Sequence, residues 1–150
     1  MISRFYDDLE VGLKTRSRAR TITEADLVMF SALSGDWYPL HTDVEYASRT
    51  RFKQRIAHGL LILTVASGLV TINPGVFIAF YGMERVRFTA PTFIGDTLHV
   101  EAEVLDREDR GPDRGLVSFR QDIVNQRGEV VCVAVKKVLM KKMPPGGTGD

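Results

Sequence analysis

Apolar and polar positions alternate with helical spacing in the first half of the chain. After a Thr23-x-x-Asp26 pattern that is typical of a helix start, residues 25–33 carry apolar side chains three and four apart. Residues 59–71 are apolar on nearly every side, which predicts a helix that other structure wraps. A short helical turn is expected over 44–50.

The second half has the alternation of β-strands, and turn sequences that contain glycine connect its runs. A short, partly exposed strand is also expected before the first helix, over residues 14–21. Helices followed by antiparallel strands indicate an α+β fold, with the apolar helix covering one face of the sheet. The four main strands are predicted at 77–91, 97–107, 116–125 and 130–141.

Length and composition indicate one ordinary globular domain. The 150 residues are 44% hydrophobic and 26% charged, which is enough to bury a core, and the domain is expected over 1–142. The Pro/Gly-rich residues 143–150 are expected to form a disordered tail. A net charge of +1 predicts no nucleic-acid or membrane partner.

Three further features predict a cytoplasmic location. The apolar run 56–72 is broken by polar residues and is shorter than the roughly 20 residues of a membrane span. The first ten residues lack the apolar stretch of a secretory signal. Cys132, the single cysteine, lies in a strand-like apolar run and is expected to be a small core residue rather than a reactive thiol.

Candidate chemistry is concentrated in two segments. The first holds an acid and an imidazole five positions apart, where Gly35 and Pro39 are expected to prevent regular helix. The second opens the apolar helix. The two segments are, in order, Ser34-Gly35-Asp36-Trp37-Tyr38-Pro39-Leu40-His41-Thr42-Asp43 and Ala57-His58-Gly59.

These residue types suit the addition or removal of water beside a carbonyl. Asp36 and His41 could hold one water between them and exchange protons with it. The unpaired N–H groups of a helix that begins at Gly59 could stabilise negative charge on the carbonyl oxygen, and a glycine permits its close approach. The three histidines lack the spacing of metal ligands, so no metal is expected.

The two segments together closely resemble the MaoC-like hydratase family, which includes (R)-specific enoyl-CoA hydratases and (3R)-hydroxyacyl thioester dehydratases. The resemblance implies the hot-dog fold, in which a curled antiparallel sheet wraps around one long helix, and a homodimer. It also implies an acyl-thioester substrate whose CoA or carrier-protein pantetheine is part of the substrate, with no separate cofactor. The matching motifs are Gly35-Asp36-x-x-Pro39-x-His41-x-Asp43 and Phe52-x-x-x-Ile56-Ala57-His58-Gly59.

Matched by position, the family's catalytic residues correspond to Asp36 and His41, and its thioester-binding backbone N–H to Gly59. A helix serine that supports the site in some members corresponds to Ser67. This chain has Tyr38 where many members have Asn, preceded by Trp37. Either Tyr38 points outward, or these two aromatic side chains shape the substrate pocket.

Several of these residues also have simpler interpretations. Asp36 could cap its own loop, and Asp43 is expected to position the loop or cap the turn at 44. His58 is expected to be structural, at the start of the apolar helix, and Ser67 could bond back to a helix carbonyl. His99 is expected to be an exposed strand residue.

The resulting hypothesis is a hydro-lyase that acts on an enoyl or (3R)-hydroxyacyl thioester. A hot-dog thioesterase is one alternative, but it needs a carboxylate directed at the carbonyl carbon. A non-catalytic hydratase-like subunit is the other, and the presence of both Asp36 and His41 counts against it. Which of the two takes the proton from water stays open, because they would titrate as a pair.

Overall fold

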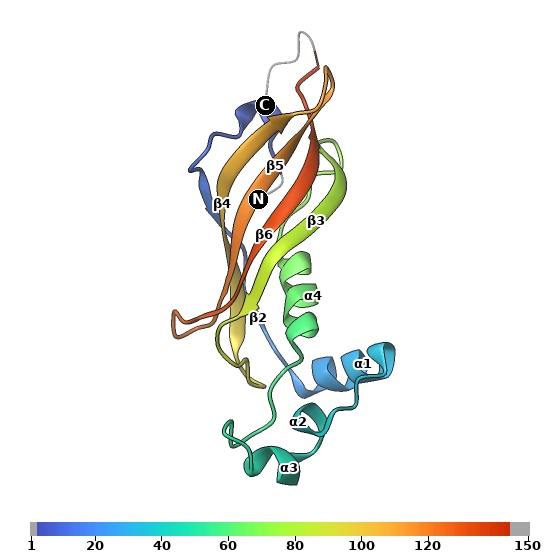
Figure 1. Cartoon of the computed structure of the whole chain (residues 1–150), viewed down its shortest axis with the longest axis vertical. Coiled ribbons are helices and arrows are strands. Elements are labelled where there is room, and N and C mark those ends of the chain that lie inside the picture. The colour runs from blue at the N-terminus through green and yellow to red at the C-terminus, as the bar shows by residue number, and fades with distance from the viewer. Residues whose placement is uncertain (1–2, 145–150) are drawn as a thin grey trace.

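A curled antiparallel sheet and one apolar helix beside it form the body of the molecule in the computed structural model, which describes residues 3–144 (Figure 1). The helices are η1 (Tyr6–Asp8), α1 (Glu24–Ser34), α2 (Pro39–Thr42), α3 (Val44–Ser48) and α4 (Gly59–Leu69). The strands are β1 (Lys14–Arg16), β2 (Arg20–Thr21), β3 (Phe77–Phe88), β4 (Thr97–Asp109), β5 (Arg114–Val124) and β6 (Val130–Lys141).

Helix α1 begins and ends where its sequence signals predict. The Thr23 hydroxyl accepts the Asp26 N–H, and the Asp26 carboxylate accepts the Thr23 N–H at 2.8 Å, which completes a capping box. At the other end Gly35 has φ of 76°, a conformation that glycine adopts without steric cost. The predicted helix is therefore confirmed.

The loop that was predicted to be free of regular helix contains the short helix α2. Pro39 occupies the first helical position, where a missing N–H costs nothing, so it starts this helix instead of preventing it. Asp43 then accepts the Tyr46 N–H at 2.9 Å and caps α3, as expected.

The sheet has the order β1-β4-β5-β6-β3 with antiparallel pairing, and β2 also pairs with β4. The four main strands are confirmed, while the strand expected over 14–21 is divided into β1 and β2. The prediction for His99 was wrong, because this residue is only 6% exposed. It is paired with Val124 of β5 on one side, and residues 17–19 pass along its other side.

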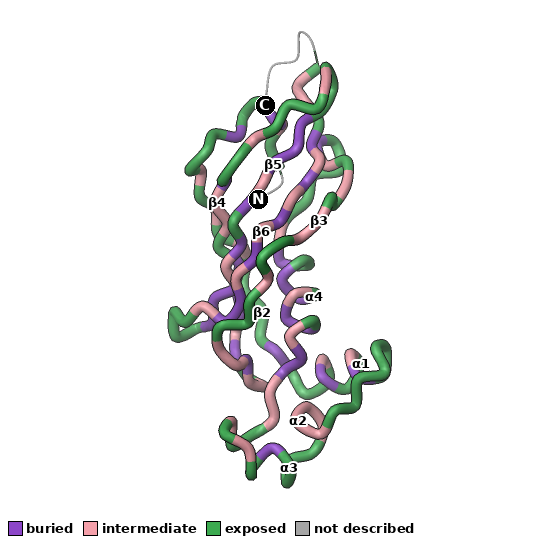
Figure 2. The backbone as a smooth tube through the Cα atoms, viewed as in Figure 1, coloured by how far each residue is buried: buried purple, intermediate pink, exposed green. Residues whose placement is uncertain are grey.

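The core consists of two apolar clusters, and Figure 2 shows where the chain is buried. The first packs α4 against the sheet, and the second packs the η1 region against it. Cys132 is buried in the first cluster, as expected, and burial raises the pKa of its thiol to about 11. One stripe of α4 that includes Leu60, Thr64, Ser67 and Gly68 is exposed. A single chain therefore does not wrap this helix completely.

Helices α1, α2 and α3 gather at the end of the molecule where α4 begins (Figure 1). Within residues 3–144, no helix is both long enough and apolar enough to cross a membrane. Of the predicted tail, residues 145–150 lie outside the described residues, and the Met143 N–H donates to the Asp7 carboxylate at 2.7 Å.

A buried carboxylate fixes the connection between β3 and β4. Asp96 accepts hydrogen bonds from the Phe93 N–H, Gln126 and Arg127, at 2.9, 2.9 and 2.7 Å. Burial by itself would raise the pKa of Asp96, but these hydrogen bonds outweigh it and lower the pKa. Asp96 therefore orders the connection that runs beside the start of α4.

We predict that Asp96→Ala lowers the free energy of unfolding by about 2–3 kcal/mol, because hydrogen bonds to a buried charged group are lost. Urea denaturation followed by circular dichroism measures this. Glu108→Ala is the matched control, since its pair with Arg110 is largely exposed and should contribute less than about 1 kcal/mol. Equal effects of the two substitutions would contradict the role given to Asp96.

Candidate active site

A cleft of about 620 Å³ opens between the start of α4, the α1–α2 region and the end of β3. It brings together the two segments that carry the candidate chemistry. The residues that line it include Phe30, Asp36, His41, Arg51, Phe52, Ile56, His58, Gly59, Leu60, Phe88 and Thr92.

The extended residues Ile56 and Ala57 form the base of this cleft. The Ala57 N–H donates to the Thr92 carbonyl at 2.8 Å, and Ile56 forms an isolated antiparallel bridge with Phe93. The β3–β4 connection thereby holds the two residues that lead directly into His58 and α4. This attachment sets the position of the helix start.

His41 is oriented by a backbone carbonyl. Helix α2 carries the ring, and its Nδ1 lies 2.7 Å from the Ile56 oxygen. A carbonyl only accepts hydrogen bonds, so Nδ1 is the protonated nitrogen of the neutral ring. Nε2 is then the nitrogen that can take up or release a proton.

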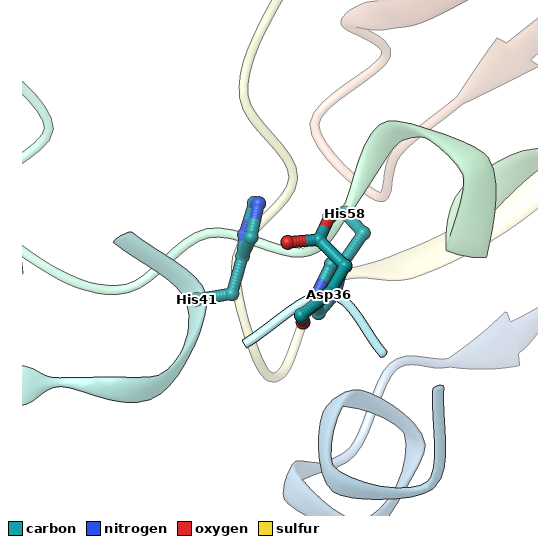
Figure 3. A group of neighbouring side chains, drawn as sticks. All are labelled: Asp36, His41 and His58. Carbon is teal, nitrogen blue, oxygen red and sulfur yellow. The ribbon is translucent and has the colours of Figure 1, made fainter. Parts of the chain in front are cut away.

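Asp36 lies on the turn that follows α1. Its Oδ1 accepts the Tyr38 N–H at 3.2 Å, and its own N–H donates to Ser34 Oγ at 3.2 Å, so the carboxylate caps its loop as the simpler interpretation proposed. The residue is exposed to solvent. Asp36, His41 and His58 converge, with one polar atom of each within 4.8 Å of the others (Figure 3).

His58 lies beneath the other two side chains and is 2% exposed. Its ring stacks on His41 with a centroid distance of 3.8 Å, and its Nε2 lies 3.1 Å from the Asp36 carbonyl oxygen and 3.3 Å from Ser31 Oγ. Burial lowers the pKa of His58; the hydrogen bond to the Asp36 carbonyl opposes this shift, and charge on His41 adds to it. His58 is therefore a neutral imidazole near pH 7.

Gly59 begins α4 and contacts an aromatic ring. Because the Ile62 N–H donates to the His58 carbonyl, the N–H groups of residues 59–61 precede the first helical bond and point out of the helix end. A Cβ on Gly59 would lie 2.6 Å from the Phe88 ring. The glycine is thus required for packing as well as for access to the helix end.

Three candidate residues lie outside the cleft of the single chain. Trp37 and Tyr38 are 55% and 51% exposed and do not line the cleft. The Tyr38 hydroxyl lies 3.1 Å from that of Tyr46, and its ring lies edge-on to the His41 ring at a centroid distance of 6.1 Å. Ser67 donates to the Thr64 carbonyl at 2.7 Å, which is the simpler of its two interpretations.

Several contributors to the site have no motif of their own. Ile56 acts through its carbonyl oxygen, and Phe88 reaches the cleft from a strand distant in the sequence. Ser31 is fully buried on α1, and a lone hydroxyl on an apolar helix face was the one available signal for it. Asp36, His41 and His58 could also hold a metal ion, which spacing along the chain did not indicate.

Known proteins resemble this chain over most of its length. Residues 9–125 match the family model described as MaoC like domain. An (R)-specific enoyl-CoA hydratase from Rhodospirillum rubrum is 35% identical over 123 residues, which cover 80% of this chain and 81% of that protein. The Protein MaoC of Klebsiella aerogenes is 38% identical over 99 residues; these cover 65% of this chain but only 29% of that longer protein.

Solved structures show the same architecture. A protein from Archaeoglobus described as a monoamine oxidase regulatory protein superposes with a TM-score of 0.87 at 38% identity, over 96% of this chain and all of that one. Rv0216 of Mycobacterium tuberculosis, described as a double hot-dog fold, superposes with a TM-score of 0.85 at 21% identity, over 97% of this chain and 46% of that one. The fold of this chain is therefore the hot-dog fold.

We predict that Gly59→Ala lowers the free energy of unfolding by about 1–3 kcal/mol, because the added methyl group overlaps the Phe88 ring. In a Phe88→Ala background the same substitution should cost much less. Thermal denaturation of the single and double variants measures the difference.

Gly68→Ala is the matched control on the same helix, because nothing lies within 4 Å of its added Cβ. It should stabilise the protein by roughly 0.5–1 kcal/mol through helix propensity. If Gly59→Ala behaved like Gly68→Ala, the contact with Phe88 would not be the reason for the glycine.

Proposed function

The chain belongs to the MaoC-like domain family, and we propose that it is a hydro-lyase that interconverts an enoyl thioester and a (3R)-hydroxyacyl thioester. The observation that carries this proposal is the convergence of the Asp36 carboxylate and the His41 ring beside the N-terminal end of α4. An acid–base pair next to unpaired N–H groups is what reversible addition of water beside a thioester requires.

The N-terminal end of α4 polarises the thioester carbonyl. The thioester oxygen accepts a hydrogen bond from the Gly59 N–H, and the positive end of the helix dipole favours the negative charge that develops there. Such preorganised donors contribute roughly 3–4 kcal/mol to the stability of a transition state. The polarised thioester makes C3 open to attack by water.

Asp36 and His41 supply the proton transfers. In this scheme the reactive form of the pair carries one exchangeable proton, either on the Asp36 carboxylate or on Nε2 of His41. During hydration one member takes a proton from the water whose oxygen bonds to C3, and the other delivers a proton to C2. The pair regains its starting state by passing one proton between its members, and dehydration reverses these steps.

The lining of the cleft also fits a thioester carried on pantetheine. Arg51 provides a cation at the cleft, with its guanidinium 4.7 Å from the Phe52 ring centroid. A cation near an apolar slot suits the phosphate groups of CoA or of a carrier-protein arm. In this scheme the pantetheine carrier belongs to the substrate, and no separate cofactor takes part.

We predict that the protein hydrates crotonyl-CoA, and that Asp36→Asn and His41→Ala each lower kcat by at least about 10²-fold, because each removes one half of the proton exchange. Loss of absorbance of the enoyl thioester, coupled to an (R)-3-hydroxyacyl-CoA dehydrogenase, measures this. Asp43→Asn is the matched control, because this substitution on the same loop keeps a cap for α3 and should retain most activity.

Near-wild-type turnover of either the Asp36 or the His41 variant would contradict the proposed mechanism. Release of free CoA without hydration would support the thioesterase alternative instead. A folded protein that is inactive with enoyl thioesters of every chain length would support the non-catalytic alternative.

We further propose that the protein is a homodimer joined along β3. This strand lies at the edge of the sheet and exposes large apolar side chains, with Phe80 52% and Tyr81 60% exposed. The exposed start of α4, where Leu60 is 65% exposed, would also be covered by a second subunit. An edge strand of this kind readily pairs with another chain.

We predict sedimentation at about twice the chain mass of 16.8 kDa, and a shift of Phe80→Asp toward the monomer because a charge replaces a buried interface ring. Analytical ultracentrifugation measures both. Val11→Asp, which changes an apolar residue of similar exposure outside β3, should leave the dimer intact. A monomeric wild type, or a Phe80→Asp dimer of unchanged affinity, would contradict the interface.

A further inference from the structure

His58 contacts both members of the acid–base pair, although the reaction described above assigns it no step. Its ring stacks on that of His41 at 3.8 Å with an interplanar angle of 27°, and its Nε2 lies 3.1 Å from the Asp36 carbonyl oxygen. On its other side the ring meets Phe30, with a centroid distance of 5.0 Å. Tyr38 also contacts both residues, with its ring edge-on to that of His41 at 6.1 Å and its N–H donating to Asp36 Oδ1, but Tyr38 is half exposed whereas His58 is buried.

The contacts of His58 determine its tautomer. The Asp36 carbonyl can only accept, so Nε2 of His58 carries the hydrogen and donates to it, with Ser31 Oγ as a second neighbour at 3.3 Å. Nδ1 is buried and has no hydrogen-bond partner. A proton on Nδ1 would place an unpaired charged N–H in the interior, which is costly, so the ring stays neutral.

A neutral aromatic ring against His41 affects the charge that His41 carries. When Nε2 of His41 holds the exchangeable proton, that ring is a cation stacked on the electron-rich face of His58. A cation over an aromatic face is stabilised, most strongly where water is excluded. A protonated His58 would instead repel it.

We propose that His58 is a positioning residue that joins the two halves of the acid–base pair: its N–H holds the Asp36 backbone, and its neutral face stabilises the protonated His41. This inference rests on the proposed function. The titratable groups that face His58 are Asp36 and His41, and its contacts from α1, Ser31 and Phe30, carry no charge.

Two substitutions separate the two contacts. His58→Gln keeps an N–H donor at a similar reach from the backbone but removes the aromatic face, whereas His58→Phe keeps the face and removes the donor. We expect each to lower kcat by about 10- to 30-fold, with KM changed by less than about threefold. Circular dichroism and thermal denaturation identify variants that are folded.

Double-variant cycles then show through which partner each contact acts. In a His41→Ala background, His58→Gln should cause little further loss of kcat, because its effect passes through the His41 ring. In an Asp36→Asn background, His58→Gln should retain its full effect. For His58→Phe we expect the opposite pattern. In the Asp36→Asn background it should cause little further loss of kcat, because the lost donor acts by holding Asp36, and in the His41→Ala background it should retain its full effect.

Retention of kcat within threefold by both folded variants, while the wild type hydrates crotonyl-CoA, would overturn the role of His58 and leave the proposed function intact. A wild type that hydrates no enoyl thioester would instead overturn the proposed function. Nitrogen-15 NMR of the wild type needs no substitution: we expect His58 as the neutral Nε2–H tautomer near pH 7. An imidazolium or an Nδ1–H tautomer there would overturn the inference.

Discussion

The attachment of residues 56–57 to the β3–β4 connection is the constraint on which the site depends. The Ala57 N–H is bonded to the Thr92 carbonyl, so the chain enters α4 at a position that the sheet determines. One residue earlier, the Ile56 carbonyl accepts Nδ1–H of His41 and thereby selects the nitrogen that exchanges protons. A single short segment therefore positions both the His41 ring and the helix end that we propose to bind the thioester oxygen.

Most of the fold could be predicted from the sequence because its signals are local. The capping box at Thr23, the glycine at position 35 and the alternation of the long strands each act over a few residues. Helix α2 was missed because Pro39 was taken to prevent a helix that it begins. The burial of His99 depends on flanking segments distant in the sequence, which no local pattern shows.

The site could be predicted only in outline, for the same reason. Asp36, His41 and Gly59 were found by motif, and the cleft brings them together. The stack of His41 on His58, the carbonyl of Ile56 and the ring of Phe88 come from contacts between distant segments. Trp37 and Tyr38 stand next to the acid in sequence, yet their exposure places them outside the cleft of the single chain.

Asp36 and His41 converge on one another, so the proposed mechanism delivers the water and the proton to the same face of the bound substrate. Hydration of crotonyl-CoA in D₂O, with the product analysed by NMR, tests it most directly. The account predicts (3R)-hydroxybutyryl-CoA as a single diastereomer, with one deuterium at C2 on the face that received the hydroxyl group. A mixture of diastereomers, a (3S) product or addition to opposite faces would contradict it.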